Sequence, residues 1–185
     1  RVYSGTVEKL RSAERLAIIQ PERVVDMALD GIEAHSALDV GTGSGVFAEA
    51  LAKRGLVVTG VDSSREMIEA AGNLVEGASF IVAKAEAVPL PDGCVDLAFL
   101  GMVLHEADDH AGMLREVRRL ATRRVAVLEW PYVEQQMGPP LDHRLRPEQV
   151  EGFAAQAGLL IDEMRALDPL VMYLLRRDRS STRSP

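Results

Sequence analysis

The strongest constraint on the fold is an alternation, repeated along most of the chain, between short β-branched runs and amphipathic helical patterns. Strand patterns occur at residues 37–40, 56–61, 79–83, 95–100, 124–129, 159–164 and 170–175. Most of these runs are followed by a segment in which apolar residues recur at helical spacing. Because parallel neighbours in a sheet need a crossover, usually a helix, the alternation predicts an α/β fold with a largely parallel sheet.

The connections refine this prediction. Helical patterns at 12–19 and 21–28 precede the first strand, and others occur at 45–54, around Met67, at 110–121 and after Pro147. The link between the last two strands, residues 165–169, is too short for a crossover, so the last strand should be antiparallel. We therefore expect a Rossmann-like, doubly wound seven-stranded sheet, mostly parallel with an antiparallel last strand, and with helices on both faces.

The length and composition suit one domain. The chain has 185 residues, of which 47% are hydrophobic, enough for a single core. We expect one domain over residues 1–175, with an N-terminal helical cap at 1–35 and the Rossmann-like core at 36–175. The Arg- and Ser-rich tail at 176–185 is expected to be disordered. No secretory pattern and no apolar run of about 18 residues or more occurs, which favours a cytoplasmic protein without stable membrane insertion.

The charge bears on the partners of the protein. A formal net charge of −7 argues against nucleic acid, whose binding normally requires a basic face. The arginines at 115–124 fit a solvated helix face better than a polymer-binding patch. A small-molecule partner is expected, and the oligomeric state stays open.

A glycine-rich segment carries the main functional signal. Residues 39–45 read Asp-Val-Gly-Thr-Gly-Ser-Gly and lie between an expected strand and an expected helix. Glycines there let the backbone approach a ligand closely, at the strand ends where doubly wound folds bind ligands. Asp62 ends the next strand about 21 residues after Gly41, where a carboxylate can accept hydrogen bonds from ribose hydroxyls. The alternatives are a tight turn and, for Asp62, a cap of the following helix.

Two cofactor classes compete for this segment. A dinucleotide fingerprint requires glycine or alanine at the position of Val46, but the third glycine here, Gly45, lies one residue earlier. An NAD-dependent oxidoreductase of Rossmann type is therefore the less favoured alternative.

The spacing of these motifs resembles that of the class I S-adenosylmethionine-dependent methyltransferases. The best match is the small-molecule group that includes the ubiquinone and menaquinone biosynthesis methyltransferases, through residues 39–45, 61–67, 85–92 and 95–105. The resemblance implies methyl transfer from S-adenosyl-L-methionine to a small-molecule acceptor, leaving S-adenosyl-L-homocysteine. It implies cofactor contacts from Asp39, Gly41, Thr42, Gly43, Gly45, Asp62, Ser63, Met67, Ala85, Glu86, Leu100 and Gly101.

Within that set, the resemblance puts Asp62 at the ribose, Met67 near the adenine and Ala85–Glu86 at the adenine edge, although Met67 fits core packing equally well. Relatives commonly have an aspartate where this chain has Lys84, and an ammonium group cannot accept the adenine hydrogen bond. Lys84 thus gives some support to a second alternative, a non-catalytic S-adenosylmethionine-binding protein.

The acceptor side is expected after the fourth and fifth strands. His105 is a candidate general base because its unperturbed pKa is near 6.5, with a structural or substrate-orienting role as the alternative. Glu129, Trp130 and Tyr132, with His105, are expected to bind the acceptor. The acidic residues before His110 fit a helix start better than a metal site, so no metal is expected. The N-terminal helices and the loop at 133–146 are the expected lids.

Overall fold

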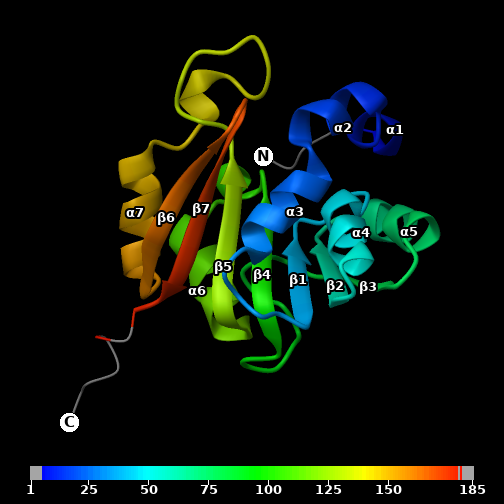
Figure 1. Cartoon of the computed structure of the whole chain (residues 1–185), viewed down its shortest axis with the longest axis horizontal. Coiled ribbons are helices and arrows are strands. Elements are labelled where there is room, and N and C mark those ends of the chain that lie inside the picture. The colour runs from blue at the N-terminus through cyan, green and yellow to red at the C-terminus, as the bar shows by residue number, and fades with distance from the viewer. Residues whose placement is uncertain (1–5, 179, 181–185) are drawn as a thin grey trace.

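Seven strands form a single mixed sheet in the computed structural model, which describes residues 6–178 and 180 (Figure 1). The strand order is β3-β2-β1-β4-β5-β7-β6. Strand β7 is antiparallel to both of its neighbours, and the other strands share one direction. This confirms the predicted fold class, including the antiparallel last strand. The strands are β1 (Ser36–Val40), β2 (Val57–Asp62), β3 (Ala78–Val82), β4 (Val95–Gly101), β5 (Ala121–Glu129), β6 (Leu159–Leu167) and β7 (Leu170–Arg177).

Helices cover both faces of this sheet. They are α1 (Val7–Leu10), α2 (Ala13–Ile19), α3 (Pro21–Leu29), α4 (Val46–Lys53), α5 (Arg65–Leu74), α6 (His110–Leu120) and α7 (Pro147–Gln156), with short 3-10 turns η1 (Leu104–Glu106) and η2 (Leu141–His143). Several begin where the sequence supplies a cap: Ser64 accepts from the N–H of Met67, and Asp109 accepts from that of Gly112. Pro21 stands at the start of α3, where its missing N–H costs nothing.

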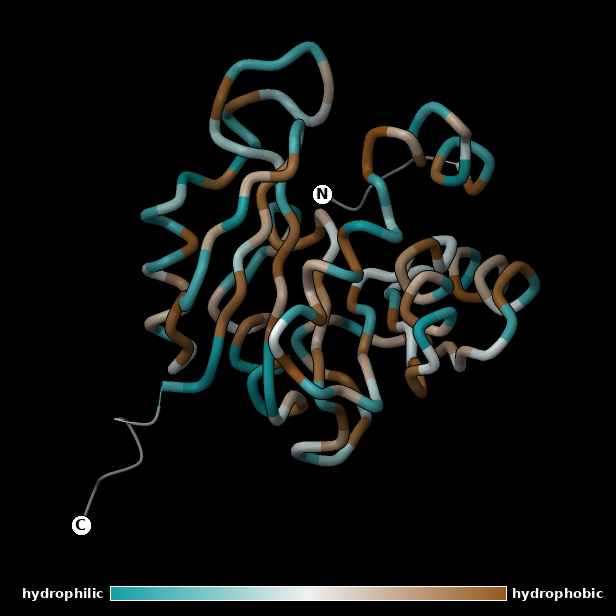
Figure 2. The backbone as a smooth tube through the Cα atoms, in the orientation of Figure 1, coloured by the Kyte–Doolittle hydropathy of each residue, from teal (hydrophilic) through white to brown (hydrophobic). Residues whose placement is uncertain are grey.

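The core has two apolar layers, one on each face of the sheet. Successive residues of β5 alternate between them: Val125 and Val127 pack with α6 and α7, whereas Ala126 and Leu128 pack with α3 and α4. Figure 2 shows hydrophobic colours along the central strands. Since both faces are covered, polar chemistry is confined to the ends of the strands.

The observed elements differ from the expected ones mainly at their boundaries. Strand β6 continues to Leu167, and β7 continues to Arg177. The Arg177 guanidinium donates to the carbonyl of Ala121 at 2.9 Å, which ties the strand end to β5. Arg176 and Arg177, expected in the tail, thus belong to the sheet. Residues 179 and 181–185 of that expected tail, and 1–5 of the expected cap, lie outside the described residues.

Candidate active site

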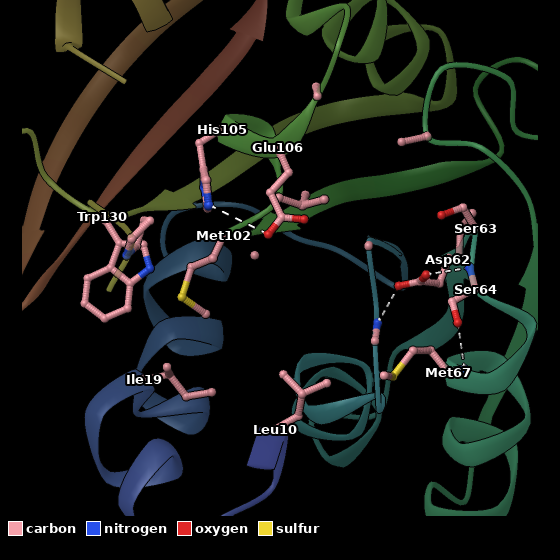
Figure 3. A pocket seen from close by; sticks show the side chains of 18 of the residues that line it. Leu10, Ile19, Asp62, Ser63, Ser64, Met67, Met102, His105, Glu106 and Trp130 are labelled. Atoms are coloured by element: carbon pink, nitrogen blue, oxygen red, sulfur yellow. Dashed lines mark hydrogen bonds and ion pairs between the residues drawn. The ribbon is translucent and has the colours of Figure 1, made fainter. Parts of the chain in front are cut away.

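A cavity of about 1260 Å³ opens at the carboxyl ends of the parallel strands (Figure 3). This volume exceeds the roughly 300–1,000 Å³ of a typical small-ligand pocket. Among the residues predicted for the site, its wall includes Gly41, Gly43, Asp62, Ser63, Met67, Ala85, Glu86, Gly101, His105 and Trp130. The other predicted residues, Asp39, Thr42, Gly45, Leu100, Glu129 and Tyr132, lie outside the cavity wall.

The glycine turn after β1 presents backbone to the cavity. Gly41 and Gly43 have φ values of 68° and 52°, in the left-handed region that side chains disfavour. A Cβ atom on Gly41 would lie 2.6 Å from Cγ2 of Val103, so the turn also needs glycine for packing. The N–H of Gly43 donates to Oδ2 of Asp62 at 2.9 Å.

Asp62 joins the turn after β1 to the start of α5. Its Oδ1 accepts from the N–H of Ser64 at 2.9 Å, while Ser64 itself caps the helix. The structure therefore assigns the helix cap to Ser64. Each carboxylate oxygen of Asp62 has a second lone pair, and Figure 3 shows this side chain in the cavity beside Ser63 and Met67. The carboxylate can accept further hydrogen bonds from a bound hydroxyl group.

Asp39 supports this turn from behind. Its side chain is 1% exposed, and the Thr42 hydroxyl donates to its Oδ2 at 2.7 Å. Burial raises the pKa of Asp39 to about 7, opposed by hydrogen bonds from Thr42 and the Ala48 backbone and assisted by the charge of Asp62. The carboxyl group holds the turn in shape without reaching the cavity.

Gly45 and Leu100 also lie away from the cavity. Gly45 is the N-cap of α4, with a φ of 80°, and a Cβ there would lie 2.8 Å from Cγ2 of Val75. The close packing of this helix start against the end of α5 explains the third glycine. Leu100 is fully buried in the sheet, and its successor Gly101 reaches the cavity instead.

The loop bearing Ala85 and Glu86 is held by a charged cluster on α6. Arg119 donates to the carbonyls of Val88 and Leu90 at 3.0 and 2.8 Å. Glu116, which pairs with Arg119, accepts from the N–H of Val88 at 2.7 Å. These contacts fix the loop that forms one end of the cavity, where Lys84 also lines the wall.

His105 and Glu129 form a hydrogen-bonded pair at the other end. Nδ1 of His105 lies 2.7 Å from Oε2 of Glu129. Oε1 of Glu129 accepts from the N–H of His105 at 3.0 Å, and Oε2 accepts from that of Trp130 at 3.3 Å. Glu129 is 2% exposed, so it stands behind His105, which lines the cavity. Burial lowers the pKa of His105, but the hydrogen bond and charge of Glu129 and the charge of Glu106 raise it above its ordinary value.

Met102, which follows β4, has a left-handed backbone at a residue other than glycine. Its φ is 57°, a conformation that usually persists only where the surroundings impose it and that often occurs at functional sites. The N–H of Met102 donates to the carbonyl of Leu128 at 2.8 Å, which holds this backbone. Figure 3 shows the thioether reaching into the cavity on the side of Trp130.

The loop after β5 is organised by Arg144, a residue that the sequence did not single out. Its side chain is almost fully buried and lies over the ring of Trp130, 5.6 Å from the ring centroid. Its guanidinium donates to the backbone carbonyls of Pro131, Val133, Met137 and Pro139 at 2.6–3.1 Å.

Because of these contacts, Met137, Gly138 and Pro139 form part of the cavity wall. Gly138 packs so closely on Trp130 that a Cβ there would lie 2.6 Å from the ring. Tyr132 points elsewhere, since its hydroxyl accepts from Arg146 at 3.3 Å. Of the aromatic residues expected in the acceptor pocket, only Trp130 reaches the cavity among the residues that the structure describes.

The N-terminal helices complete the cavity opposite His105. Leu10, Ile18 and Ile19 contribute apolar surface, and Figure 3 shows Leu10 and Ile19 facing the cavity. Arg11 anchors this segment by pairing with Glu49 at 2.9 Å and donating to the carbonyl of Ser44 at 3.2 Å. Both segments expected as lids therefore border the cavity.

The described part of the chain has neither a metal-binding cluster nor a membrane-spanning helix. No cluster of three or more His, Cys, Asp or Glu side chains there is arranged to hold a metal ion. None of the helices of residues 6–178 has the length and apolar character needed to cross a membrane.

The chain is similar in sequence and fold to known methyltransferases. Residues 38–127 match a family described as a methyltransferase domain. The chain is 33% identical over 112 residues to a demethylmenaquinone methyltransferase of Thermotoga maritima, covering 58% of this chain and 48% of the relative. It is 29% identical over 154 residues to a malonyl-[acyl-carrier protein] O-methyltransferase of Serratia marcescens, covering 75% of this chain and 60% of that protein.

The chain thus spans about half the length of the curated relatives that it matches. Among solved structures, a SAM dependent methyltransferase from Aquifex aeolicus superposes with a TM-score of 0.83 at 24% identity, covering 91% of this chain and 95% of the other. The sequence motifs, the sheet topology and the family match agree. Nearly half of the chain thus matches a methyltransferase-domain family, and its fold is that of a solved SAM dependent methyltransferase, in line with the resemblance that the sequence motifs suggested.

Proposed function

We propose that the protein transfers a methyl group from S-adenosyl-L-methionine to a small-molecule acceptor. One observation carries the proposal: a single cavity contains the Asp62 carboxylate and the glycine turn at one end, and the His105 side chain beside Met102 and Trp130 at the other. A nucleoside held at the first end and an acceptor held at the second can meet within the same enclosure.

The residues at the first end fit the cofactor. The turn at Gly41 and Gly43 lines the cavity without side chains, which leaves room for the methionine portion. Asp62 has lone pairs to accept from the ribose hydroxyls, and Met67 with Ala85 and Glu86 would border the adenine. Asp39, Thr42 and Gly45, expected as direct contacts, would act by keeping the turn in place.

The bound cofactor would supply an electrophilic methyl group on its sulfonium, so the protein mainly has to align the acceptor behind that methyl carbon for an in-line displacement. The fixed walls at this end suit that task. Trp130 is held between Gly138 and Arg144, and Met102 is held by its hydrogen bond to Leu128.

Two features support a small acceptor. The N-terminal helices and the loop around Met137 wall the cavity, and the chain carries a net charge of −7, which disfavours a nucleic-acid substrate. The two curated relatives carry names that point to different acceptors, a demethylmenaquinone and a malonyl-[acyl-carrier protein]. The identity of the acceptor therefore has to come from this cavity.

The test has two parts. Calorimetric titration should show micromolar or tighter binding of S-adenosylhomocysteine and no comparable binding of NADH. Tight binding of NADH without binding of S-adenosylhomocysteine would overturn the proposal. Labelled S-adenosylmethionine should then pass its methyl group to at least one member of a small-molecule panel. Binding without transfer to any acceptor would favour the non-catalytic alternative that Lys84 suggests.

A further inference from the structure

His105 stands between two carboxylates at the acceptor end of the cavity. Glu129, from the end of β5, accepts at Nδ1 at 2.7 Å. On the other side of the ring, Nε2 lies 3.9 Å from Oε1 of Glu106, on η1, and Figure 3 shows this pair at the cavity. The backbone N–H of His105 also donates to Glu129, so the ring and the main chain are fixed to the same buried group.

This pairing determines which ring nitrogen can react. An ionised carboxylate only accepts hydrogen bonds, so in the neutral imidazole the hydrogen resides on Nδ1 and the lone pair on Nε2. His105 and Glu106 both line the cavity, whereas Glu129 does not. The nitrogen that faces Glu106, rather than Glu129, is therefore the one able to accept a proton from a bound molecule.

The charged groups around His105 favour its protonated form on balance. Glu129 and Glu106 raise the pKa of His105, while burial and Arg144, from the loop before α7, lower it. His110, at the start of α6, is a further titratable group in electrostatic contact with it. An imidazolium formed during the reaction would thus lie between two carboxylates that stabilise it.

We propose that Glu129 positions His105 to remove the proton from a hydroxyl group of the acceptor, so that methyl transfer occurs on oxygen. The inference rests on the proposed function and deepens it by naming the acceptor group and a positioning residue. His105 is the group that touches the acceptor, and Glu129 acts through His105.

The acceptor oxygen forms a bond to the methyl carbon while the carbon–sulfur bond breaks and its electron pair stays on sulfur, giving S-adenosylhomocysteine and an ether. The hydroxyl proton moves to Nε2 of His105. The imidazolium then releases that proton to solvent, restoring the starting form of the protein.

The apolar surface near His105 indicates what kind of acceptor molecule carries the hydroxyl group. Met102 and Trp130 line the cavity near His105, and Met137 lines it from the loop that packs on Trp130. The Trp130 ring is fixed by Gly138 and Arg144. Sulfur and indole surfaces suit a flat, largely apolar molecule. A planar phenol meets both requirements, since its ring fits this wall and its hydroxyl group needs a base to react near neutral pH.

The first experiment examines the ring without any reaction. Nitrogen-detected NMR of labelled histidine in the ligand-free protein should show His105 protonated on Nδ1 when neutral, with a pKa above 6.5, and Glu129→Gln should lower that pKa. The H105Q spectrum assigns the signal among the four histidines, and H143Q, at an exposed position, is the matched control. A neutral His105 protonated on Nε2 in the wild type would overturn the proposal without any measurement of activity.

The second experiment measures transfer to a panel of planar phenols, anilines and thiols. At least one phenol should be methylated on oxygen, and kcat/KM should rise with pH through the pKa of His105. H105Q should lower kcat by about 10²- to 10⁴-fold with the Kd for S-adenosylhomocysteine within twofold of wild type. E129Q should move the acidic limb of the profile to lower pH and add no further loss to H105Q.

The outcomes separate this inference from the proposed function. Failure of the wild type to bind S-adenosylhomocysteine would refute the proposed function itself. If cofactor binding is normal, three results would refute only the role of the His105–Glu129 pair. They are the absence of any O-methylated phenol, an unaltered rate in H105Q, and an acidic limb of the pH profile that E129Q does not move.

Discussion

Oδ2 of Asp62 accepts a hydrogen bond of 2.9 Å from the N–H of Gly43, which ties the end of β2 to the turn that follows β1. A side chain at Gly43 would project toward Leu10, whose Cδ1 would lie 3.4 Å from the new Cβ. Gly43→Leu should therefore fill the space proposed for the cofactor and abolish measurable binding of S-adenosylhomocysteine. Because φ is 52°, it should also lower the free energy of unfolding by about 1–2 kcal/mol.

The matched control for that variant is Gly55→Leu. Gly55 also has a positive φ, of 82°, and a Cβ there meets nothing within 4 Å. It should cost similar stability in a denaturant titration while leaving the Kd unchanged. If calorimetry gave equal affinities of Gly43→Leu and Gly55→Leu for S-adenosylhomocysteine, the cofactor would bind elsewhere.

Arg119 should control the nucleotide end of the cavity from a distance. Lysine cannot reproduce its donation to the carbonyls of Val88 and Leu90 together with its pairing to Glu116. Arg119→Lys should lower the free energy of unfolding by about 1–2 kcal/mol and raise the Kd for S-adenosylhomocysteine severalfold. The control is Arg123→Lys, which alters an ion pair with Asp96 at the opposite end of β4. If both variants bind S-adenosylhomocysteine with the same Kd, Arg119 does not control the nucleotide end of the cavity.

Arg144 should determine the order of the loop at 131–144. Its guanidinium bonds four carbonyls of that loop, and lysine can satisfy only part of them. Arg144→Lys should accelerate amide hydrogen exchange in this loop by at least tenfold, because the loop opens without global unfolding. Binding of S-adenosylhomocysteine should stay within twofold of wild type. Unchanged exchange would mean that the loop is held by other contacts.

Asp39 should make stability depend on pH in an unusual direction. Burial raises its pKa to about 7, so the folded protein holds the proton more tightly than the unfolded chain. The resulting stabilisation is complete below the unfolded pKa of about 4 and is lost as the pH rises through 7. The free energy of unfolding of wild type minus that of Asp39→Asn should fall by a few kcal/mol between pH 4.5 and pH 8. A difference that stays flat across this range would contradict the assignment.

The sequence predicted the topology because its signals are local. Each strand run is bounded by glycine, serine or a helical pattern, and the short link between the last two strands forces the antiparallel β7. Glycine content alone did not distinguish roles within the turn. Gly43 lines the cavity, whereas Gly45 serves the packing of α4 against Val75, a contact with a residue that is distant in sequence.

The acceptor side was less predictable for the same reason. His105 and Glu129 were each expected near the acceptor, but their hydrogen bond depends on the pairing of β4 with β5, in which Gly101 lies opposite Leu128. That register brings the residues after both strands together and could have suggested the pair. Arg144 gave no such signal, because its role depends on the path of an irregular loop around one guanidinium.

Cofactor binding at the proposed site should depend most on the hydrogen bonds that the Asp62 carboxylate accepts. Calorimetric titration of S-adenosylhomocysteine into wild type, Asp62→Asn and the exposed control Asp142→Asn tests it directly. Loss of hydrogen bonds to a charged group costs about 1.5–3 kcal/mol, so Asp62→Asn should weaken binding by about 10- to 100-fold, with Asp142→Asn matching wild type. A Kd for Asp62→Asn within twofold of wild type would contradict the proposed cofactor site.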